Sequence, residues 1–193
     1  MARIKSALEI AMEKTESVKG DKTSINQFEA KQRGKKLANE FLDDPGKPLA
    51  DEIKNCPKDE KDSLKQGVFD VLVSQLVLPG KEEDLPRIEG AVSGVKIILN
   101  NSQFNEMAKQ FSQLLRQFLS EASKYEEAIK RQYAPKLRQK EEEIARRLGR
   151  QVSLDPFQDP EFVAFFNQNM NALKENYQSA IDQIKEAAVE MYV

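Results

Sequence analysis

The chain contains no histidine, and this absence removes several classes of active site. Serine and cysteine hydrolase sites, His-Glu-x-x-His zinc sites and the Glu-x-x-His di-iron motif of helical bundles all need an imidazole. The sequence also lacks the glycine-rich phosphate loops of nucleotide-binding proteins and the alternating acids of a calcium loop. The sequence therefore gives no catalytic residue, no cofactor-binding residue and no metal ligand.

Cysteine is limited to Cys56, so no disulfide can form within the chain. A lone thiol is typical of a reducing compartment. The first residues lack the unbroken apolar core of a signal peptide. The most apolar run, Val68–Leu78, is well short of the roughly 20 residues that a membrane-spanning helix needs. These features predict a cytoplasmic protein with no membrane span.

The chain also has few turn-forming residues and little net charge. Glycine and proline number eight each among 193 residues, which favours long elements with few turns. The 30 basic and 32 acidic residues nearly cancel, so the whole chain exerts no general attraction on nucleic acid or on an anionic membrane. We therefore predict an all-α fold whose charges have to be interpreted locally.

The sequence pattern of residues 1–101 predicts a body made of several short helices. Gly20 is a plausible stop for the first helix, and Ser24 with Gln27 forms a capping-box pattern for the second. Gly90 and Gly94 share one helix face and would let another helix approach closely. The expected helices are Ile4–Val18, Ser24–Leu42, a short one after Pro48, about Asp59–Leu78, and Asp84–Leu99.

Residues 102–193 predict a long antiparallel helical hairpin, a coiled-coil-like arm that packs on the body at its base. Apolar residues recur at helical spacing from Gln103 to Gly149, and Pro135 within this run predicts a kink. The returning helix begins at Asp159-Pro160-Glu161, which has a capping acid and a first-turn proline. Two sevenfold repeats follow in it: Phe166, Leu173, Ala180, Ala187 and Met170, Tyr177, Ile184, Met191. Body and arm could also form one continuous elongated domain.

If the hairpin closes at the segment Gly149–Pro160, the pairing of residues across its two antiparallel helices follows from the sequence. Leu148 is then expected near Phe162, Leu137 near Leu173, and Tyr125 near Ile184. Each pairing places an apolar residue against another apolar residue.

The end of the hairpin is the best candidate for a binding surface. Four of the ten phenylalanines lie within ten residues there, next to several arginines, and an exposed aromatic group beside arginine is typical of a protein-binding hot spot. The alternative is that the loop from Gln151 to Gln158 folds back and buries these rings. The candidate residues are Phe157, Phe162, Phe165, Phe166, Arg146, Arg147 and Arg150.

Three other functions stay open but are favoured less. Basic runs at Lys31–Lys36 and Lys136–Arg150 could contact nucleic-acid phosphates, although the second run also holds three glutamates and no aromatic residue lies within either run for base stacking. A carboxylate enzyme or a metal-binding bundle would need acids that converge, whereas Glu141–Glu143 fan out around their helix. Cys56 lies between Lys54 and Lys58, which could activate the thiol, but the chain has no histidine to serve as its acid–base partner.

One segment carries a family resemblance. Ile4-Lys5-Ser6-Ala7-Leu8-Glu9-Ile10-Ala11-Met12-Glu13-Lys14-Thr15, followed by Gly20-Asp21-Lys22, resembles the N-terminal signature of an uncharacterised bacterial family of short helical proteins. The resemblance implies a bacterial cytoplasmic protein and assigns no activity. Together with the residue patterns, it leads us to expect a non-enzymatic interaction or assembly module that binds a protein partner, a second copy of itself, or both.

Overall fold

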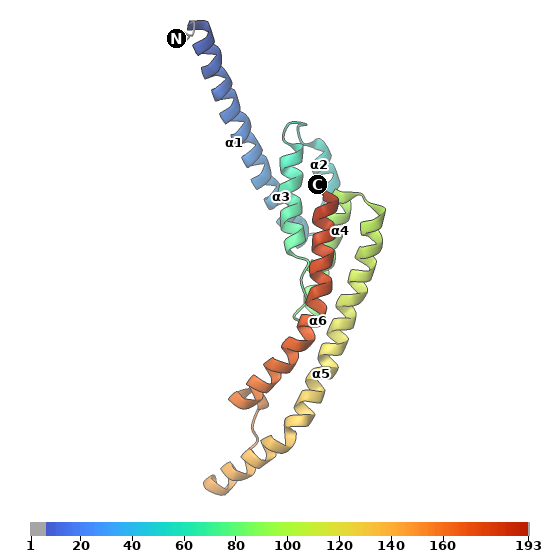
Figure 1. Cartoon of the computed structure of the whole chain (residues 1–193). Helices are drawn as coiled ribbons and strands as arrows, with labels where there is room; N and C mark the ends of the chain where they lie inside the picture. The colour runs from blue at the N-terminus through green and yellow to red at the C-terminus, as the bar shows by residue number, and fades with distance from the viewer. Residues whose placement is uncertain (1–6, 193) are drawn as a thin grey trace, which may run out of the picture. The chain divides into compact units, whose positions relative to one another are not determined.

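The computed structural model describes the backbone of residues 7–192 and the side chains of residues 24–192. All regular secondary structure in this range is helical (Figure 1), which confirms the all-α class. The α-helices are α1 (Ala7–Asp43), α2 (Leu49–Asn55), α3 (Lys61–Ser74), α4 (Leu85–Leu99), α5 (Ser102–Leu148) and α6 (Pro160–Tyr192). Two 3-10 helices, η1 (Glu82–Asp84) and η2 (Pro156–Gln158), precede α4 and α6.

Internal contacts divide the chain into two compact units. One comprises the chain up to Leu76 together with Arg87–Asn101, and so holds α1 to α3 and nearly all of α4. The other comprises Val77–Pro86 and the chain from Ser102 on, and so holds the α5–α6 hairpin. The hairpin unit thus has a long segment that begins at Ser102 and a short one, Val77–Pro86, that precedes most of α4.

In the first unit, α1 packs along α3, and α2 packs against both. Gly94 of α4 lies close to the side chains of Leu72 and Phe41. A Cβ atom on Gly94 would be 2.6 Å from Leu72 Cδ1 and 3.1 Å from Phe41 Cε1. Gly90 has more room, since its nearest neighbour would be Pro45 Cγ at 3.8 Å. Close packing therefore depends on Gly94 and much less on Gly90.

The expected break at Gly20 is wrong. One helix, α1, continues from Ala7 through Gly20 and Ser24 to Asp43, so the first unit contains a 37-residue helix and not only short ones. The expected start at Ile4 lies outside the described residues. A glycine inside a helix costs only about 1 kcal/mol relative to alanine, and its backbone can keep helical dihedrals. A glycine therefore ends a helix only where the chain also turns away.

The other helix boundaries are close to expectation. The helix expected at Asp59–Leu78 is shorter, because Gln75 N–H donates to Leu72 O and Leu76 N–H to Val73 O, tightening the last turn. Helix α5 runs unbroken through Pro135, and Figure 1 shows that it is bent. The proline ring prevents the hydrogen bond to the carbonyl of Arg131, which accounts for a bend without a break.

Helices α5 and α6 lie side by side and antiparallel (Figure 1). Phe118 packs against Tyr177, and Tyr133 packs against Phe162, each pair with ring centroids 5.2 Å apart. The expected register is therefore wrong: Phe162 lies opposite Tyr133 and not opposite Leu148, fifteen residues further on. The cause is that α5 extends past the start of α6, and the connecting segment runs back beside it.

The buried face of α6 also differs from the expected sevenfold repeats. Phe162, Met170, Ile181 and Ala188 are buried, whereas Ala180 and Ala187 are only half-buried. Together with half-buried apolar residues, these positions follow steps of four, four and three: 162, 166, 170, 173, 177, 181, 184 and 188. An eleven-residue repeat gives about 3.67 residues per turn, close to a straight helix, whereas a sevenfold repeat requires left-handed supercoiling.

Candidate binding surface at the end of the hairpin

The segment between α5 and α6 is held in place by three local contacts. Gly149, at φ +67°, ends α5 with an N–H to Ala145 O bond of 2.9 Å. Leu154 N–H donates to Glu141 Oε1 at 2.8 Å, which fixes the returning chain against α5. Asp155 caps η2 by accepting from Phe157 N–H at 3.0 Å. These contacts determine where Phe157 lies.

Five aromatic rings form one cluster at this end of the hairpin. Phe157 makes edge-to-face contacts with Phe162 and Phe166, each at 5.2 Å between ring centroids. Tyr133 contacts Phe162 at 5.2 Å and Phe165 at 6.1 Å. Lys130 Nζ lies 5.3 Å from the Phe157 centroid, over the ring. We call these five rings the aromatic cluster.

The candidate phenylalanines differ in exposure. Phe162 is fully buried and serves the hairpin core, and Phe165 and Phe166 are half-buried. Phe157 is 45% exposed, although it is held on two sides by other rings. The returning loop thus covers the cluster with one of its own rings, and Phe157 is the ring most available to a partner.

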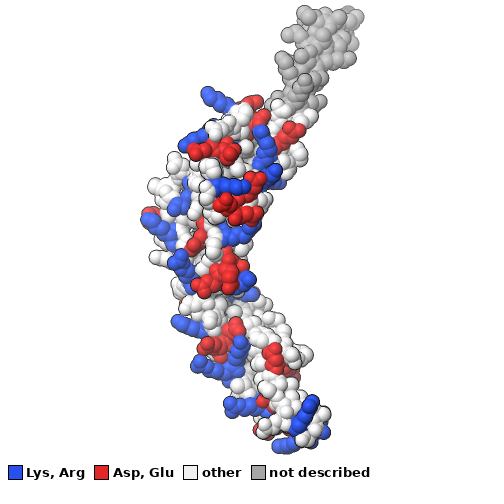
Figure 2. All heavy atoms as spheres, turned by 180° about the vertical axis from the view of Figure 1, so that it is seen from behind, with Lys and Arg blue, Asp and Glu red and all other residues white. Residues whose placement is uncertain are grey.

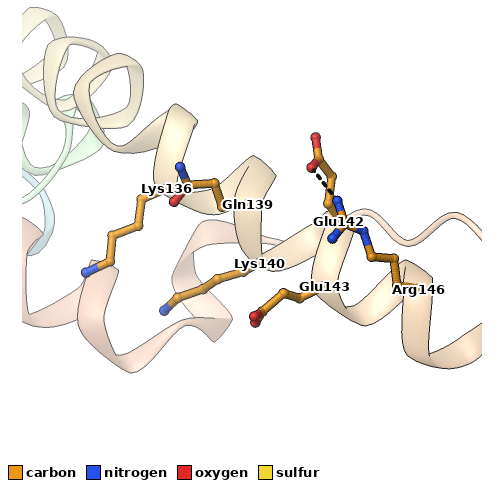
Figure 3. A pocket seen from close by; sticks show the side chains of 6 residues that line it. All are labelled: Lys136, Gln139, Lys140, Glu142, Glu143 and Arg146. Atoms are coloured by element: carbon orange, nitrogen blue, oxygen red, sulfur yellow. Dashed lines mark ion pairs between the residues drawn. The ribbon is translucent and has the colours of Figure 1, made fainter.

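The candidate arginines are not among the residues that contact this cluster: they lie on the last turn of α5 and just after it, and Arg146 is thirteen residues, about 20 Å of helix, beyond Tyr133. Arg146 pairs with Glu142 at 3.9 Å (Figure 3). Arg147 and Arg150 are exposed, and neither they nor the exposed Arg138 makes an ion pair within the described side chains. The free positive groups at this end are therefore guanidinium groups.

A second cluster, which we call the polar latch, joins the start of α6 to α5. Its centre is Asp159, only 8% exposed, which accepts from Tyr133 Oη at 2.9 Å and from Lys140 Nζ at 2.7 Å. Glu161 accepts from Lys140 Nζ at 2.6 Å and pairs with Lys136 at 3.1 Å. Asp159 also accepts from Glu161 N–H at 3.1 Å and so caps α6, as the sequence predicted.

These contacts shift the pKa values of the latch in consistent directions. The hydrogen bond from Lys140 lowers the pKa of Asp159, and hydrogen bonds from Lys140 and Lys136 lower the pKa of Glu161. Hydrogen bonds to Asp159 and Glu161 raise the pKa of Lys140. Burial, with the hydrogen bond to Asp159, raises the pKa of Tyr133. At neutral pH the acids and Lys140 are therefore charged and Tyr133 is neutral.

A groove lined by charged side chains of α5 lies beside the polar latch. Its volume is about 410 Å³, and its lining residues are Lys136, Gln139, Lys140, Glu142, Glu143 and Arg146 (Figure 3). Figure 3 shows Lys136 and Lys140 extending on the same side of the helix, while Glu142 and Arg146 pair with each other. No group of three or more potential metal ligands occurs among the side chains of residues 24–192.

Cys56 belongs to the first unit. It lines a pocket of about 390 Å³ with Arg33, Leu37 and Leu64 among others. Burial, more than any charge, raises the pKa of its thiol, so the thiol is protonated at neutral pH. This direction is opposite to the activation by Lys54 and Lys58 considered from the sequence.

Sequence reasoning missed the polar latch. It identified Asp159 and Glu161 as a helix start but gave Lys140 and Tyr133 no role. The two residues are seven apart and therefore share one face of α5, the face of Ile129 and Leu137. A lysine on an otherwise apolar face is the one signal that indicated a buried acid opposite.

Comparison with known proteins identifies a family and no named relative. The profile of a family of unknown function (DUF6657) matches residues 50–190. The chain belongs to this family. This confirms the expected membership in an uncharacterised family, although the segment from Ile4 to Lys22 that suggested it lies outside the matched residues. Neither the curated proteins nor the solved structures contain a match. Over residues 7–192, no helix combines the length and apolar character that crossing a bilayer requires.

Proposed function

We propose that the protein is a non-enzymatic protein-binding or assembly module that acts through the end of the α5–α6 hairpin. The observation that carries the proposal is Phe157, which is 45% exposed and fixed by edge-to-face contacts with Phe162 and Phe166. A ring that is already ordered loses little conformational entropy when a partner covers it. Rigid aromatic side chains of this kind are enriched among the residues that dominate binding energy.

The surrounding charges support a protein partner over a nucleic acid. Between Lys136 and Glu161 there are six basic residues, Lys136, Arg138, Lys140, Arg146, Arg147 and Arg150, and six acidic ones, Glu141, Glu142, Glu143, Asp155, Asp159 and Glu161. The net charge is zero, so the hairpin end offers no general attraction for a polyanion. Figure 2 shows basic and acidic side chains interleaved over the face it presents. Nucleic-acid binding through the basic arm is the alternative that the experiment has to address.

Affinity capture from native cytosol, the compartment that the lone cysteine favours, tests the proposal. Tagged wild-type protein is compared with Phe157→Ser and with Phe28→Ser, a matched control because Phe28 is 64% exposed on α1. We expect a protein partner that is retained by the control and lost with Phe157→Ser. Capture that is equal in all three proteins contradicts the proposal. Capture that disappears only with nuclease and falls steeply with salt supports the nucleic-acid alternative.

The module could also assemble with itself. Light scattering after size-exclusion chromatography distinguishes a monomer from a dimer in the purified protein. A dimer that Phe157→Ser dissociates and Phe28→Ser leaves intact would make a second copy the partner. Circular dichroism of each variant verifies that the helices are unchanged.

A further inference from the structure

We infer that two copies of the chain pair through the N-terminal part of α1, with residues 7–26 of one copy antiparallel to the same residues of the other. This surface belongs to the first unit, so the inference goes beyond the hairpin end and does not depend on the proposed function. It follows from three properties of α1: a length that extends past its neighbour, an apolar seam, and charges that match in one register.

The N-terminal part of α1 extends past α3, the helix that covers the rest of it. The two helices run antiparallel (Figure 1), and Lys31 pairs with Asp70 at 2.8 Å near the end of α3. Since α3 ends at Ser74, four residues after Asp70, its cover of α1 ends about four residues before Lys31. Residues 24–29 are accordingly exposed on every side of the helix, and Ile25 is 55% exposed.

The extending stretch needs a partner to be stable as a helix. It is helical from Ala7 onward, and up to Asn26 it is about 30 Å long at 1.5 Å per residue. Isolated helices shorter than about 12–15 residues are marginal in water even when rich in alanine, and most helical stability comes from packing an apolar face. Gly20 interrupts this stretch, and several of its residues are serine or threonine, which are weak helix formers.

The sequence of this stretch contains one seam of the kind that pairs two helices. Three of its apolar residues recur every seven positions, and the whole seam advances in alternating steps of three and four. Such a sevenfold repeat is the pattern of a coiled coil. A second copy presents the same seam and can therefore cover it by two-fold symmetry. In chain order, the seam positions are Leu8, Ala11, Thr15, Val18, Lys22 and Ile25.

The charges favour an antiparallel pair over a parallel one. In a parallel pair each seam position faces itself, so Lys22 would face Lys22 of the second copy, and Lys14 would flank Lys19. In an antiparallel pair Lys22 instead lies opposite Ala11. Lys14 and Asp21 occupy equivalent positions beside the seam, and the antiparallel pair places Lys14 of each copy next to Asp21 of the other. Symmetry produces this pair of opposite charges twice.

The same two charges select the register. With Leu8 opposite Ile25, the overlap covers residues 7–26, which is the stretch that extends past α3. A shift by one heptad in one direction places Lys14 next to Lys14 of the second copy. A shift in the other direction places Asp21 next to Asp21. Like charges across a helix pair are destabilising, so only the first register is complementary.

Sedimentation velocity of the purified full chain over a range of concentrations tests the dimer. We expect a concentration-dependent dimer in the wild type. Ile25→Asp should raise its dissociation constant about a hundredfold, because it places two charges in the apolar seam. Gln27→Asp is the matched control, since it adds the same charge to an exposed residue on the opposite side of α1 and should leave the dimer unchanged.

Exchanging the two charges tests the orientation and the register. Lys14→Glu and Asp21→Lys should each weaken the dimer about tenfold, because each converts two pairs of opposite charges into pairs of like charges. The double variant restores opposite charges and should bind about as tightly as the wild type. In a parallel pair, by contrast, Lys14→Glu would strengthen the dimer by placing a glutamate beside Lys19.

Several outcomes overturn the inference. A wild type that is monomeric at every concentration, a dimer that is indifferent to Ile25→Asp, or a double variant that does not recover each contradicts the antiparallel pair. If Phe157→Ser and not Ile25→Asp dissociates the dimer, the hairpin end is the surface of self-assembly and only this inference fails. If Ile25→Asp dissociates the dimer and Phe157→Ser has no effect on capture, this inference stands and the proposed function fails.

Discussion

Gly34 of α1 and Gly67 of α3 lie face to face where these helices pack together. A Cβ atom on Gly34 would be 2.1 Å from Leu64 O, and one on Gly67 would be 2.1 Å from Lys31 O. Each glycine thus leaves room for the backbone of the opposite helix. The packing of α1 on α3 therefore requires a residue without a Cβ atom at both positions.

Alanine at either glycine should destabilise the first unit. Because the obstructing atoms are backbone carbonyls, the helices would have to move apart, and overpacking of this kind costs about 1–3 kcal/mol or more. Urea denaturation of Gly34→Ala and Gly67→Ala measures the loss. Gly90→Ala is the control: its Cβ would meet only Pro45 at 3.8 Å, so the higher helix propensity of alanine should stabilise it by about 0.5–1 kcal/mol. Equal stability of all three variants would contradict the close approach.

The glycine contact shows what the sequence could and could not predict about the fold. The spacing of apolar residues predicted that the chain is helical and that it ends in a hairpin. It could do so because this spacing is a property of each helix taken alone. The sequence pattern gave Gly34 and Gly67 no packing role, and Gly20 looked like a stop. The role of a helical glycine depends on which segment crosses it, and that partner lies about thirty residues away. Local propensity does not contain this information.

The same limit applies to the hairpin end. The cap at Asp159 depends on adjacent residues and was predicted. The contacts of Asp159 with Tyr133 and Lys140 depend on the register of α5 and α6, which is set by how the returning loop lies against Glu141. Once the register shifts by fifteen residues, every predicted cross-helix pair changes. Among the candidate phenylalanines, Phe157 is 45% exposed and Phe162 is fully buried, and this difference follows from the same register.

Removing two neighbouring phenylalanine rings should have different costs. Phe162→Ala leaves a cavity in the buried hairpin core and should cost about 3–5 kcal/mol of unfolding free energy. Phe157→Ala removes a ring that is already 45% exposed and should cost much less, about 1 kcal/mol. Thermal and urea denaturation compare the two variants. A similar large loss in both would mean that Phe157 is a core residue and would weaken its role in binding.

Cys56 should react slowly with thiol reagents in the folded protein. Burial raises the pKa of this thiol above its ordinary value, so the reactive thiolate is scarce at neutral pH. Reaction with a chromogenic disulfide should therefore accelerate only at alkaline pH, and unfolding in urea should accelerate it at neutral pH. Faster reaction in the folded than in the unfolded protein would indicate an activated thiol and would reopen a redox role.

Tyr177 should titrate later than an ordinary tyrosine. Burial and the 2.6 Å hydrogen bond to Glu121 raise its pKa to about 12. Because the raised pKa belongs to the folded state, the stability it contributes is complete below the ordinary pKa of about 10 and is lost as the pH rises toward 12. Tyrosinate absorbance should show a late step that Tyr177→Phe removes. A titration of the four tyrosines in one step near pH 10 would contradict this.

The polar latch should make the hairpin sensitive to acid. The pKa values of Asp159 and Glu161 are lowered by Lys140, so their contribution to stability is complete above the ordinary carboxyl pKa of about 4 and is lost as the pH falls below it. The raised pKa of Lys140 acts at the other end: its contribution is complete below about pH 10 and is lost above it. Between these limits the latch is intact.

Lys140→Met tests this latch, because it removes the shared cation and keeps much of the side-chain volume. We expect the variant to be less stable at neutral pH, since Asp159 would keep its charge with only Tyr133 and backbone donors. We also expect its stability to fall less steeply than that of the wild type below pH 4, because the acids no longer gain from ionising. Denaturation across the pH range measures both effects, and Lys109→Met controls for the loss of an exposed lysine on the same helix. Parallel pH profiles in the wild type and Lys140→Met would mean that the ion pairs of the latch do not stabilise the hairpin.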